Sequence, residues 1–430
     1  MTEQPTDRLR DSADDGAAAA ESPEFAADPR NAIGAAAALI WPAPAVLRWG
    51  VRGDRPPADM TAVSEHVFFP TRPMLTPAGH AAGFGAFMAR ARGALPFYRR
   101  AAHLGLAAGL GSGGAQWVWR DRLFVDVPVD QVTDYGTGIT AFIADLIGQR
   151  VTTAIAIGAV RANRKPVIYA FDDKGHLVAY AKLAWNPLTA ILNANEAAAL
   201  DEVTNAAPRT FDVPRTMFHG LFNGAPLLVL EPLAIPFTGR STPVARLVPA
   251  MLELASIGGL EVAPLTSGAW WTSVQQRLAA APDSALKQRL TTMMARIVET
   301  DGQRPVTLGR WHGDWTKWNM AARHHALQLW DFERSSPWAP LGFDSIHLSI
   351  HAVLERNKAT PAEMVDLLSS AAVQDPLAAF TDQEAARSLV VSAYLVEISL
   401  RAIADSAQIS WPRVERRANW LLDILQRQVG

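Results

Sequence analysis

The sequence predicts an α+β protein with two lobes: a small, mostly antiparallel β lobe, then a larger, mostly helical lobe, with an N-terminal extension ahead of both. Three observations predict this class. Strand-like apolar runs cluster between residues 151 and 234, helical spacing of apolar residues dominates after about residue 240, and 430 residues suffice for two cores. This order of elements is typical of a ligand site in a cleft between lobes.

The composition describes a globular chain and excludes several kinds of site. Apolar residues make up 49% of the chain, charged residues make up 19%, and the net charge is −2. No basic surface therefore indicates binding to nucleic acid or to an anionic membrane. The chain has no cysteine, which excludes disulfides, thiol nucleophiles and cysteine metal sites and fits a cytoplasmic protein.

We expect neither a signal peptide nor a membrane span in the first part of the chain. Residues 1–30 are acidic and rich in small residues, so we expect a mobile tail. Residues 31–47 carry no charge, but this segment is short, mostly alanine and interrupted by Pro42 and Pro44, so we expect it to pack against the protein. We expect residues 31–140 to form an extension or cap on the small lobe.

The small lobe is expected over residues 141–233. Strand-like runs separated by turn signals lie at 151–160, 166–172, 176–185, 214–224 and 225–234. The break DKG between the second and third runs predicts a tight hairpin turn. A helix is expected over 187–203, where Asn186 would cap the first turn and Pro187 suits the first helical position. The helical lobe, with the site, would then occupy residues 234–430.

The stretch WHGDWTKWNM, residues 311–320, combines several polar groups with three tryptophans. Unpaired buried polar groups are costly, so we expect these groups to be held rigidly in an apolar cleft. Asn319 comes five positions after Asp314, and Asp331 follows twelve positions later, after a hairpin-like segment. An Asp can orient a hydroxyl and take its proton, while amide and carboxylate oxygens suit Mg²⁺ on nucleotide phosphates. The pattern indicates phosphoryl transfer, because the kinase catalytic loop has the same interval.

The ordered motifs HGDxxxxN, DFE and GFD resemble those of the aminoglycoside phosphotransferase and choline kinase superfamily, small-molecule kinases with a protein-kinase-like fold. DFERSS followed by GFD resembles choline and ethanolamine kinases in particular. The resemblance implies Asp314 as the catalytic Asp and Asn319 and Asp331 as Mg²⁺ ligands. It also implies that His312 shapes the loop and that Asp344 braces it from the following helix.

Upstream motifs resemble the small lobe of the same superfamily. LVAYAKLAW looks like its third strand, which implies that Lys182 contacts the nucleotide phosphates and that Glu196 is its ion-pair partner. LLVLEPLA resembles the hinge, where the backbone near Glu231 and Leu233 would hydrogen-bond the adenine. In the DFE motif, Glu333 is close enough in sequence to the aspartate to assist the metal or the acceptor.

Two departures from protein kinases are visible. The turn GAVRANRKP between the first two strands has one glycine in place of a Gly-rich loop, so four residues stay open as phosphate contacts: Arg161, Asn163, Arg164 and Lys165. DFE replaces DFG, and no activation segment or APE motif is evident. These departures favour a small-molecule substrate over a protein.

Histidines and tryptophans near the motif have a structural interpretation as well. His347 and His351 share a helix face at the spacing of zinc ligands, but Leu348 replaces the Glu of HExxH, so we expect a packed or cleft-lining pair. We expect packing as the role of most of the flanking tryptophans, although one or more could line an acceptor site: Trp315, Trp318 and Trp338.

The expected function is Mg²⁺-dependent transfer of a phosphoryl group from ATP or GTP to a small-molecule hydroxyl. Sugars, aminoglycosides and amino alcohols such as choline are the acceptor classes that the resemblance implies. Two other functions stay open: a catalytically silent kinase-fold protein that binds nucleotide or a protein partner, and an enzyme that transfers another part of the nucleotide. We expect no nucleic-acid partner and no membrane span.

Overall fold

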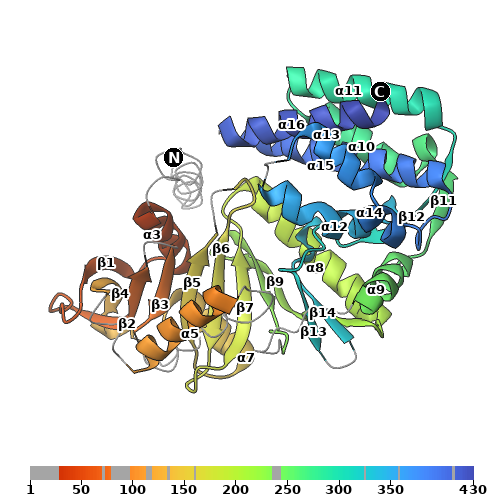
Figure 1. Cartoon of the computed structure of the whole chain (residues 1–430). Coiled ribbons are helices and arrows are strands. Elements are labelled where there is room, and N and C mark those ends of the chain that lie inside the picture. The colour runs from red at the N-terminus through yellow and green to blue at the C-terminus, as the bar shows by residue number, and fades with distance from the viewer. Residues whose placement is uncertain are drawn as a thin grey trace, which may run out of the picture. The chain divides into compact units, whose positions relative to one another are not determined.

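The computed structural model of the chain describes residues 29–69, 73–78, 97–112, 119–132, 136–158, 161–234, 244–323, 326–356, 359–408 and 412–430. The chain forms two compact units (Figure 1). Unit 1 comprises Met1–Ala197 and Pro214–Gly239, and unit 2 comprises Ala198–Val213 and Arg240–Gly430. Each unit is described by itself. The tail expected over residues 1–30 lies outside the described residues, except for its last two positions.

The described residues of unit 1 form one sheet of nine strands, in which every neighbouring pair is antiparallel. The strand order is β1 (Val46–Val51), β4 (Asp121–Pro128), β2 (Met60–Phe69), β3 (Met74–Pro77), β5 (Thr152–Ile157), β6 (Pro166–Phe171), β7 (Leu177–Leu183), β10 (Ala225–Leu230), β9 (Thr216–Phe222). The segment expected as an extension or cap therefore contributes four strands, β1 to β4, to the same sheet as the small-lobe strands.

Helices cover both faces of this sheet. On one face α3 (Pro29–Ile40) and α7 (Gly138–Ile147) share a core with Ile155 of β5. On the other face α5 (Phe97–Gly111) contributes Ala107 to a core with Ala154 and Ala156. The residues of α3 that are buried recur at helical spacing: Ala32, Ile33, Ala36, Ala37 and Ile40. The charge-free segment thus packs on the sheet, and no described helix is long and apolar enough to cross a membrane.

The alternation of buried residues along strand β7 explains where the side chain of Lys182 lies. Ala179, Ala181 and Leu183 are buried at every second position. Because successive side chains of a strand point to opposite faces, Lys182 lies on the other face of the sheet. The strand predicted here is confirmed, as are the four other strands predicted between residues 151 and 234.

Local polar contacts fix the ends of these elements as the sequence predicted. In the β6–β7 hairpin, Asp172 Oδ1 accepts from the backbone N–H of Lys174 (2.9 Å) and of His176 (2.7 Å). Helix α8 (Pro187–Ala206) begins with Asn186 Oδ1 accepting from the N–H of Thr189 at 2.8 Å. The predicted hairpin turn and helix cap are both confirmed.

Unit 2 is mostly helical. Its helices are α9 (Val244–Ser256), α10 (Ala269–Ala280), α11 (Ala285–Asp301), α12 (Phe343–Arg356), α13 (Pro361–Ser369), α14 (Ala371–Leu377), α15 (Glu384–Gln408) and α16 (Pro412–Val429). The longest of them, α15, buries fourteen of its residues, from Leu389 to Ile403. This burial makes α15 the centre of the unit 2 core.

In the part of unit 2 that the structure describes there are also two small sheets, and the sequence did not predict the first of them. It joins β11 (Glu261–Pro264), β12 (Pro305–Trp311) and β15 (Ser336–Pro340). The second joins β13 (Met320–Arg323), β14 (Ala326–Leu329) and β8 (Phe211–Asp212). The hairpin expected after Asn319 is therefore present. Of the turn predicted over ARHH, residues 322–323 belong to β13, and residues 324–325 lie outside the described residues. The predicted α+β class is confirmed.

Candidate active site

A lysine and a glutamate form an ion pair inside unit 1. Lys182 Nζ on β7 lies 2.8 and 2.7 Å from the two carboxylate oxygens of Glu196 on α8. Glu196 is fully buried, whereas the Lys182 side chain stays 13% exposed. Asn193 fixes the helix to the strand by donating from Nδ2 to Lys182 O at 2.8 Å. The structure thus brings together the two residues that the sequence paired, and holds the ammonium group in one position.

The connection between β5 and β6 carries the four phosphate-contact candidates. The ring N–H of Trp185 donates to the backbone carbonyl of Arg164, which anchors this connection to the end of β7. Lys165 is buried and Arg161 is exposed, with Asn163 and Arg164 between them in exposure. Burial lowers the pKa of the Arg164 guanidinium. All four residues stay candidates.

The segment after β10 holds the two hinge candidates, Glu231 and Leu233. The backbone N–H of Glu231 donates to Arg215 O at 2.9 Å, which fixes the chain as it leaves the sheet. Glu231 could therefore meet a ligand through its carbonyl oxygen, and Leu233 through its amide.

In unit 2 the HGD loop follows β12 directly and is fixed from several sides. Gly313 has a φ of 85°, and a Cβ at this position would overlap Arg334 O, so only glycine fits. Asp344, at the start of α12, accepts from the backbone N–H of His312 (2.7 Å) and of Gly313 (3.3 Å). Arg401 on α15 donates from Nη1 to Gly313 O at 2.7 Å. The backbone of the loop is therefore held by two helices.

The ring of His312 connects the loop to the DFE motif. Burial lowers the pKa of His312 to about 4, so its ring is neutral at neutral pH. Nδ1 accepts from the backbone N–H of Asp314 (3.2 Å), so Nε2 carries the proton and donates to Trp330 O (3.0 Å). Burial also raises the pKa of Asp344 to about 7, despite the two N–H groups that it accepts from. His312 and Asp344 thus both contact the loop that they were expected to shape.

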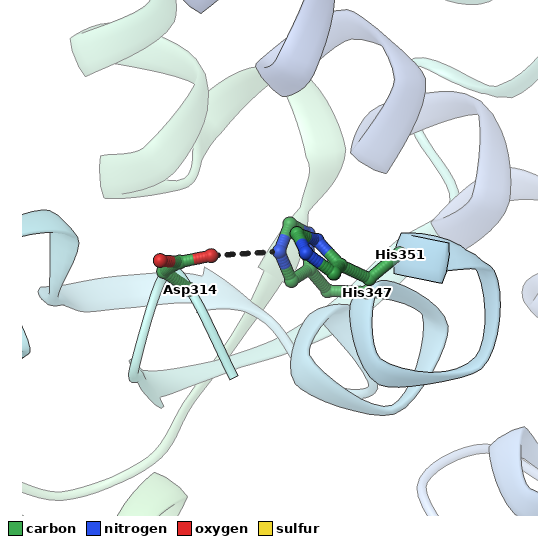
Figure 2. Close-up of side chains that lie close together, drawn as sticks. All are labelled: Asp314, His347 and His351. Atoms are coloured by element: carbon green, nitrogen blue, oxygen red, sulfur yellow. Dashed lines mark hydrogen bonds and ion pairs between the residues drawn. The ribbon is translucent and has the colours of Figure 1, made fainter. Parts of the chain in front are cut away.

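The carboxylate of Asp314 is held at both of its oxygens. Oδ2 accepts from Asn319 Nδ2 at 2.9 Å, and Oδ1 lies 3.1 Å from His347 Nε2 (Figure 2). Burial raises the pKa of the Asp314 carboxyl, but the hydrogen bond with His347 contributes to a net pKa below the usual value. The side chain is still 37% exposed. Asp314 is therefore a fixed anion at neutral pH that a ligand can reach.

The two histidines expected to form a packed or cleft-lining pair lie beside Asp314. Their ring centroids are 5.2 Å apart, and Figure 2 shows both rings on the side of α12 that faces Asp314. His347 Nδ1 lies 2.7 Å from the hydroxyl of Tyr394, which is fully buried on α15. His351 Nε2 accepts from Trp318 Nε1 at 3.0 Å. Burial lowers the pKa of His351 to about 4, so this ring is neutral at neutral pH.

Asp331 and Glu333 bring two carboxylates together at the end of the β13–β14 hairpin. Their nearest ligand oxygens lie within 4.8 Å of each other, and Glu333 is buried. Asp331 has a φ of 70°, a left-handed conformation that is uncommon outside glycine. The backbone N–H of Trp330 donates to Asn319 O at 3.1 Å, so the hairpin brings Asn319 back beside the DFE motif.

Sequence reasoning missed Tyr394, Arg401 and the contact between His347 and Asp314. His347 lies three positions after Asp344, so the two side chains share a face of α12, and this spacing could have indicated that both reach the loop. Tyr394 and Arg401 lie seven positions apart on α15. No sequence motif connects α15 with the HGD loop, so these two contacts had no signal.

No protein-family model and no curated protein sequence matches the chain. Among solved structures, a choline/ethanolamine kinase family protein from Mesorhizobium loti is 13% identical (TM-score 0.40, 61% of this chain, 84% of that chain). An ethanolamine kinase from Plasmodium vivax is 12% identical (TM-score 0.43, 63% and 82%). The aminoglycoside phosphotransferase APH(4)-Ia is 10% identical (TM-score 0.43, 67% and 96%). The chain is similar to these three solved structures at low identity.

Proposed function

We propose that the chain is a phosphotransferase that moves the γ-phosphoryl group of ATP or GTP to a hydroxyl of a small molecule. The observation that carries this proposal is the state of Asp314. Its carboxylate is an accessible anion, fixed by Asn319 and His347 in a loop that α12 and α15 hold. Such a group can orient an acceptor hydroxyl and take its proton.

The residues beside Asp314 fit Mg²⁺, which prefers oxygen ligands. Asn319 uses its amide nitrogen to donate to Asp314 O (3.0 Å) and Oδ2 (2.9 Å), which leaves the amide oxygen for another partner. Asp331 and Glu333 add carboxylate oxygens that lie close together. Asn319 and Asp331 would hold the ion, with Glu333 assisting. Bound there, Mg²⁺ would neutralise charge on the phosphates.

The roles proposed for the other residues are those that the superfamily resemblance implies. Lys182, held by Glu196, would position a nucleotide phosphate, and Glu231 and Leu233 would bind the base. The acceptor oxygen forms a bond to the γ-phosphorus while the bond to the β–γ bridging oxygen breaks, and the hydroxyl proton passes to Asp314. ADP or GDP leaves. The DFERSS motif favours an amino alcohol as acceptor, with sugars and aminoglycosides as the other classes.

The test is a mass-spectrometric screen with pooled sugars, aminoglycosides and amino alcohols, in the presence of Mg²⁺ and ATP or GTP. With the parent protein, we expect a product whose mass exceeds that of one of the acceptors by one phosphoryl group. The Asp314→Asn variant is the control and should give little or no product. A phosphorylated product at the parental rate in that variant would reject the role of Asp314.

The same screen separates the two other functions. Attachment of a nucleotidyl group would show that a different part of the nucleotide is transferred. Binding of Mg·ATP without any product across the acceptor classes would favour a silent nucleotide-binding protein. Binding should depend on Asp331 in either case, because its carboxylate is a proposed Mg²⁺ ligand.

A further inference from the structure

Asp314 also belongs to a group of nitrogen and oxygen ligands that shares no residue with the proposed Mg²⁺ ligands. His347 and His351 lie one turn apart on α12, and each offers a ring nitrogen (Figure 2). With an oxygen of Asp314, these ligand atoms all lie within 4.8 Å of one another. Two histidines spaced four apart on a helix, with a carboxylate opposite, form a common arrangement for zinc.

The distances suit a small tetrahedral ion. Zinc binds nitrogen and oxygen at about 2.0–2.2 Å, so neighbouring ligand atoms around it lie about 3.3 Å apart. His347 Nε2 and Asp314 Oδ1 already lie 3.1 Å apart. His351 is partly exposed, so its ring can move the remaining distance by rotation of its side chain.

The far side of His347 provides the support that metal-binding imidazoles usually have. The nitrogen that does not bind the ion generally donates its proton to an oxygen, which fixes the ring and its tautomer. Tyr394 places its hydroxyl oxygen 2.7 Å from His347 Nδ1, and it is fully buried on α15. In the metal-free protein Nε2 donates its proton to Asp314. When an ion binds, that proton leaves Nε2 and Nδ1 carries one, which it donates to Tyr394, so Nε2 presents its lone pair to the ion.

The hydrogen bond between Trp318 and His351 opposes the binding of an ion, and this makes the proposed site testable. Trp318 Nε1 donates to His351 Nε2 at 3.0 Å, and an indole N–H can only donate. A neutral imidazole with an ion on one nitrogen carries a proton on the other. The hydrogen bond from Trp318 is therefore lost whichever nitrogen of His351 binds the ion.

We propose that Asp314, His347 and His351 bind a divalent transition-metal ion of the zinc type. Three protein ligands leave one coordination position open. Two imidazoles favour zinc over Mg²⁺, which takes oxygen ligands. An ion on Oδ1 occupies the carboxylate, so zinc would also inhibit the transfer of the phosphoryl group. That consequence rests on the proposed function, whereas the binding itself does not.

The experiment is a Zn²⁺ titration of the metal-free, full-length protein against a chromophoric chelator, with millimolar Mg²⁺ present. We expect one tightly bound Zn²⁺ per chain. His351→Gln and His347→Gln should each weaken binding by more than tenfold, and Tyr394→Phe by about tenfold, as for a lost supporting hydrogen bond. His219→Gln, which changes an exposed histidine on β9 of unit 1, is the control and should bind as the parent does.

The Trp318→Phe variant tests whether the hydrogen bond from Trp318 to His351 weakens Zn²⁺ binding. Removing the indole N–H removes a competitor for His351, so Zn²⁺ should bind about twofold to tenfold more tightly. Equal affinity in the parent and His351→Gln would overturn the proposal, as would weaker binding by Trp318→Phe. Where turnover is measurable, zinc should slow the parent more than His351→Gln, each relative to its own zinc-free rate. A protein with no detectable turnover would leave the binding result intact.

Discussion

At the scale of single residues, the hydrogen bonds to Asp314 lower the basicity of its carboxylate and fix its orientation. The donors on its two oxygens stabilise the anion, which makes the carboxylate a weaker base but fixes its direction. Phosphoryl transfer through a loose transition state depends mainly on positioning and charge neutralisation. A weak but rigid carboxylate therefore suits the proposed reaction.

Asp314→Asn should lower turnover by about two to four orders of magnitude, the usual scale for a lost general base. The affinity for the nucleotide should change little, because Asp314 is proposed to contact the acceptor. Steady-state kinetics with the acceptor found in the screen would measure both quantities. A turnover within a factor of a few of the parent would contradict the assignment.

Gly313→Ala should disturb the loop itself. The added Cβ would overlap Arg334 O, and the φ of 85° is strained for alanine, at a cost of about 1–3 kcal/mol. Denaturant unfolding would measure the loss of stability, and turnover should fall with it because Asp314 is the next residue. As a matched control, Gly105→Ala on α5 meets no neighbouring atom, and it should be neutral or slightly stabilising.

His66 should make the stability of unit 1 depend on pH. Burial lowers its pKa to about 4, and the hydrogen bond with Thr153 O offsets only part of that effect. Between pH 6.5 and 4 the His66 ring binds a proton in the unfolded chain but stays neutral in the native state, so the free energy of unfolding falls as the pH falls through this range. His66 contributes about 3 kcal/mol to this free energy; the contribution is fully present above pH 6.5 and is lost as the pH falls to about 4.

His66→Gln should therefore flatten the fall of the thermal midpoint between pH 7 and pH 4.5, whatever its effect at pH 7. His219→Gln, on the exposed surface of the same unit, should keep the parental slope. Parallel slopes in all three proteins would show that the His66 ring is not held neutral.

At the scale of elements, side chains of α15 contact both the HGD loop and His347. Tyr394, Glu397 and Arg401 recur at positions i, i+3 and i+7, so they lie on one side of the helix. Tyr394 supports His347, and Arg401 holds Gly313 O. Glu397 in turn accepts from Arg401 and Arg277, which lower its pKa to about 2 although burial alone would raise it. One helix thus fixes both the loop and a partner of its carboxylate.

Glu397→Gln should destabilise unit 2 by about 1–3 kcal/mol, because it leaves the partly exposed guanidinium groups of Arg401 and Arg277 without their buried counter-charge. Urea unfolding would measure the change. Glu384→Gln, at the exposed start of the same helix, should cost less than about 1 kcal/mol. Similar losses in the two variants would mean that the network contributes no more than a surface charge.

Elements with a strong local signal were predictable from the sequence, and those without one were not. The β6–β7 hairpin and the start of α8 were found because Asp172 and Asn186 satisfy neighbouring backbone groups, which is local chemistry. The joining of β1–β4 to the small-lobe sheet was missed, because pairing such as that of β3 with β5 is non-local. At the site, motif spacing led to Asp314, whereas Tyr394 reaches it through a helix that carries no motif.

At the scale of the whole molecule, the chain passes between its two units more than once. Residues 198–213 belong to unit 2, although unit 1 continues over residues 214–239. This short segment contributes β8, which pairs with β14. Its Thr210 is bound by Glu253 of α9, and Glu202 pairs with the buried guanidinium of Arg310. Unit 2 therefore needs residues 198–213, which come before the last segment of unit 1 in the sequence.

A fragment of residues 240–430 should unfold about 5 °C below a fragment of residues 198–430. Leaving the buried guanidinium of Arg310 without Glu202, which is itself largely exposed, costs about 1–3 kcal/mol, and each kcal/mol shifts the midpoint by about 2–4 °C at this size. Circular dichroism melts of the two fragments would measure the difference. Coincident melts would mean that residues 198–213 add nothing to unit 2.

This interleaving also sets an order for synthesis. A ribosome releases the chain from its N-terminus, so every strand of the nine-stranded sheet has emerged once β10 has passed, and unit 1 can close early. The β8 segment has emerged by then but must wait for β14, which begins only at Ala326. Translation therefore completes the half that carries Lys182 first, and the half that carries Asp314 last.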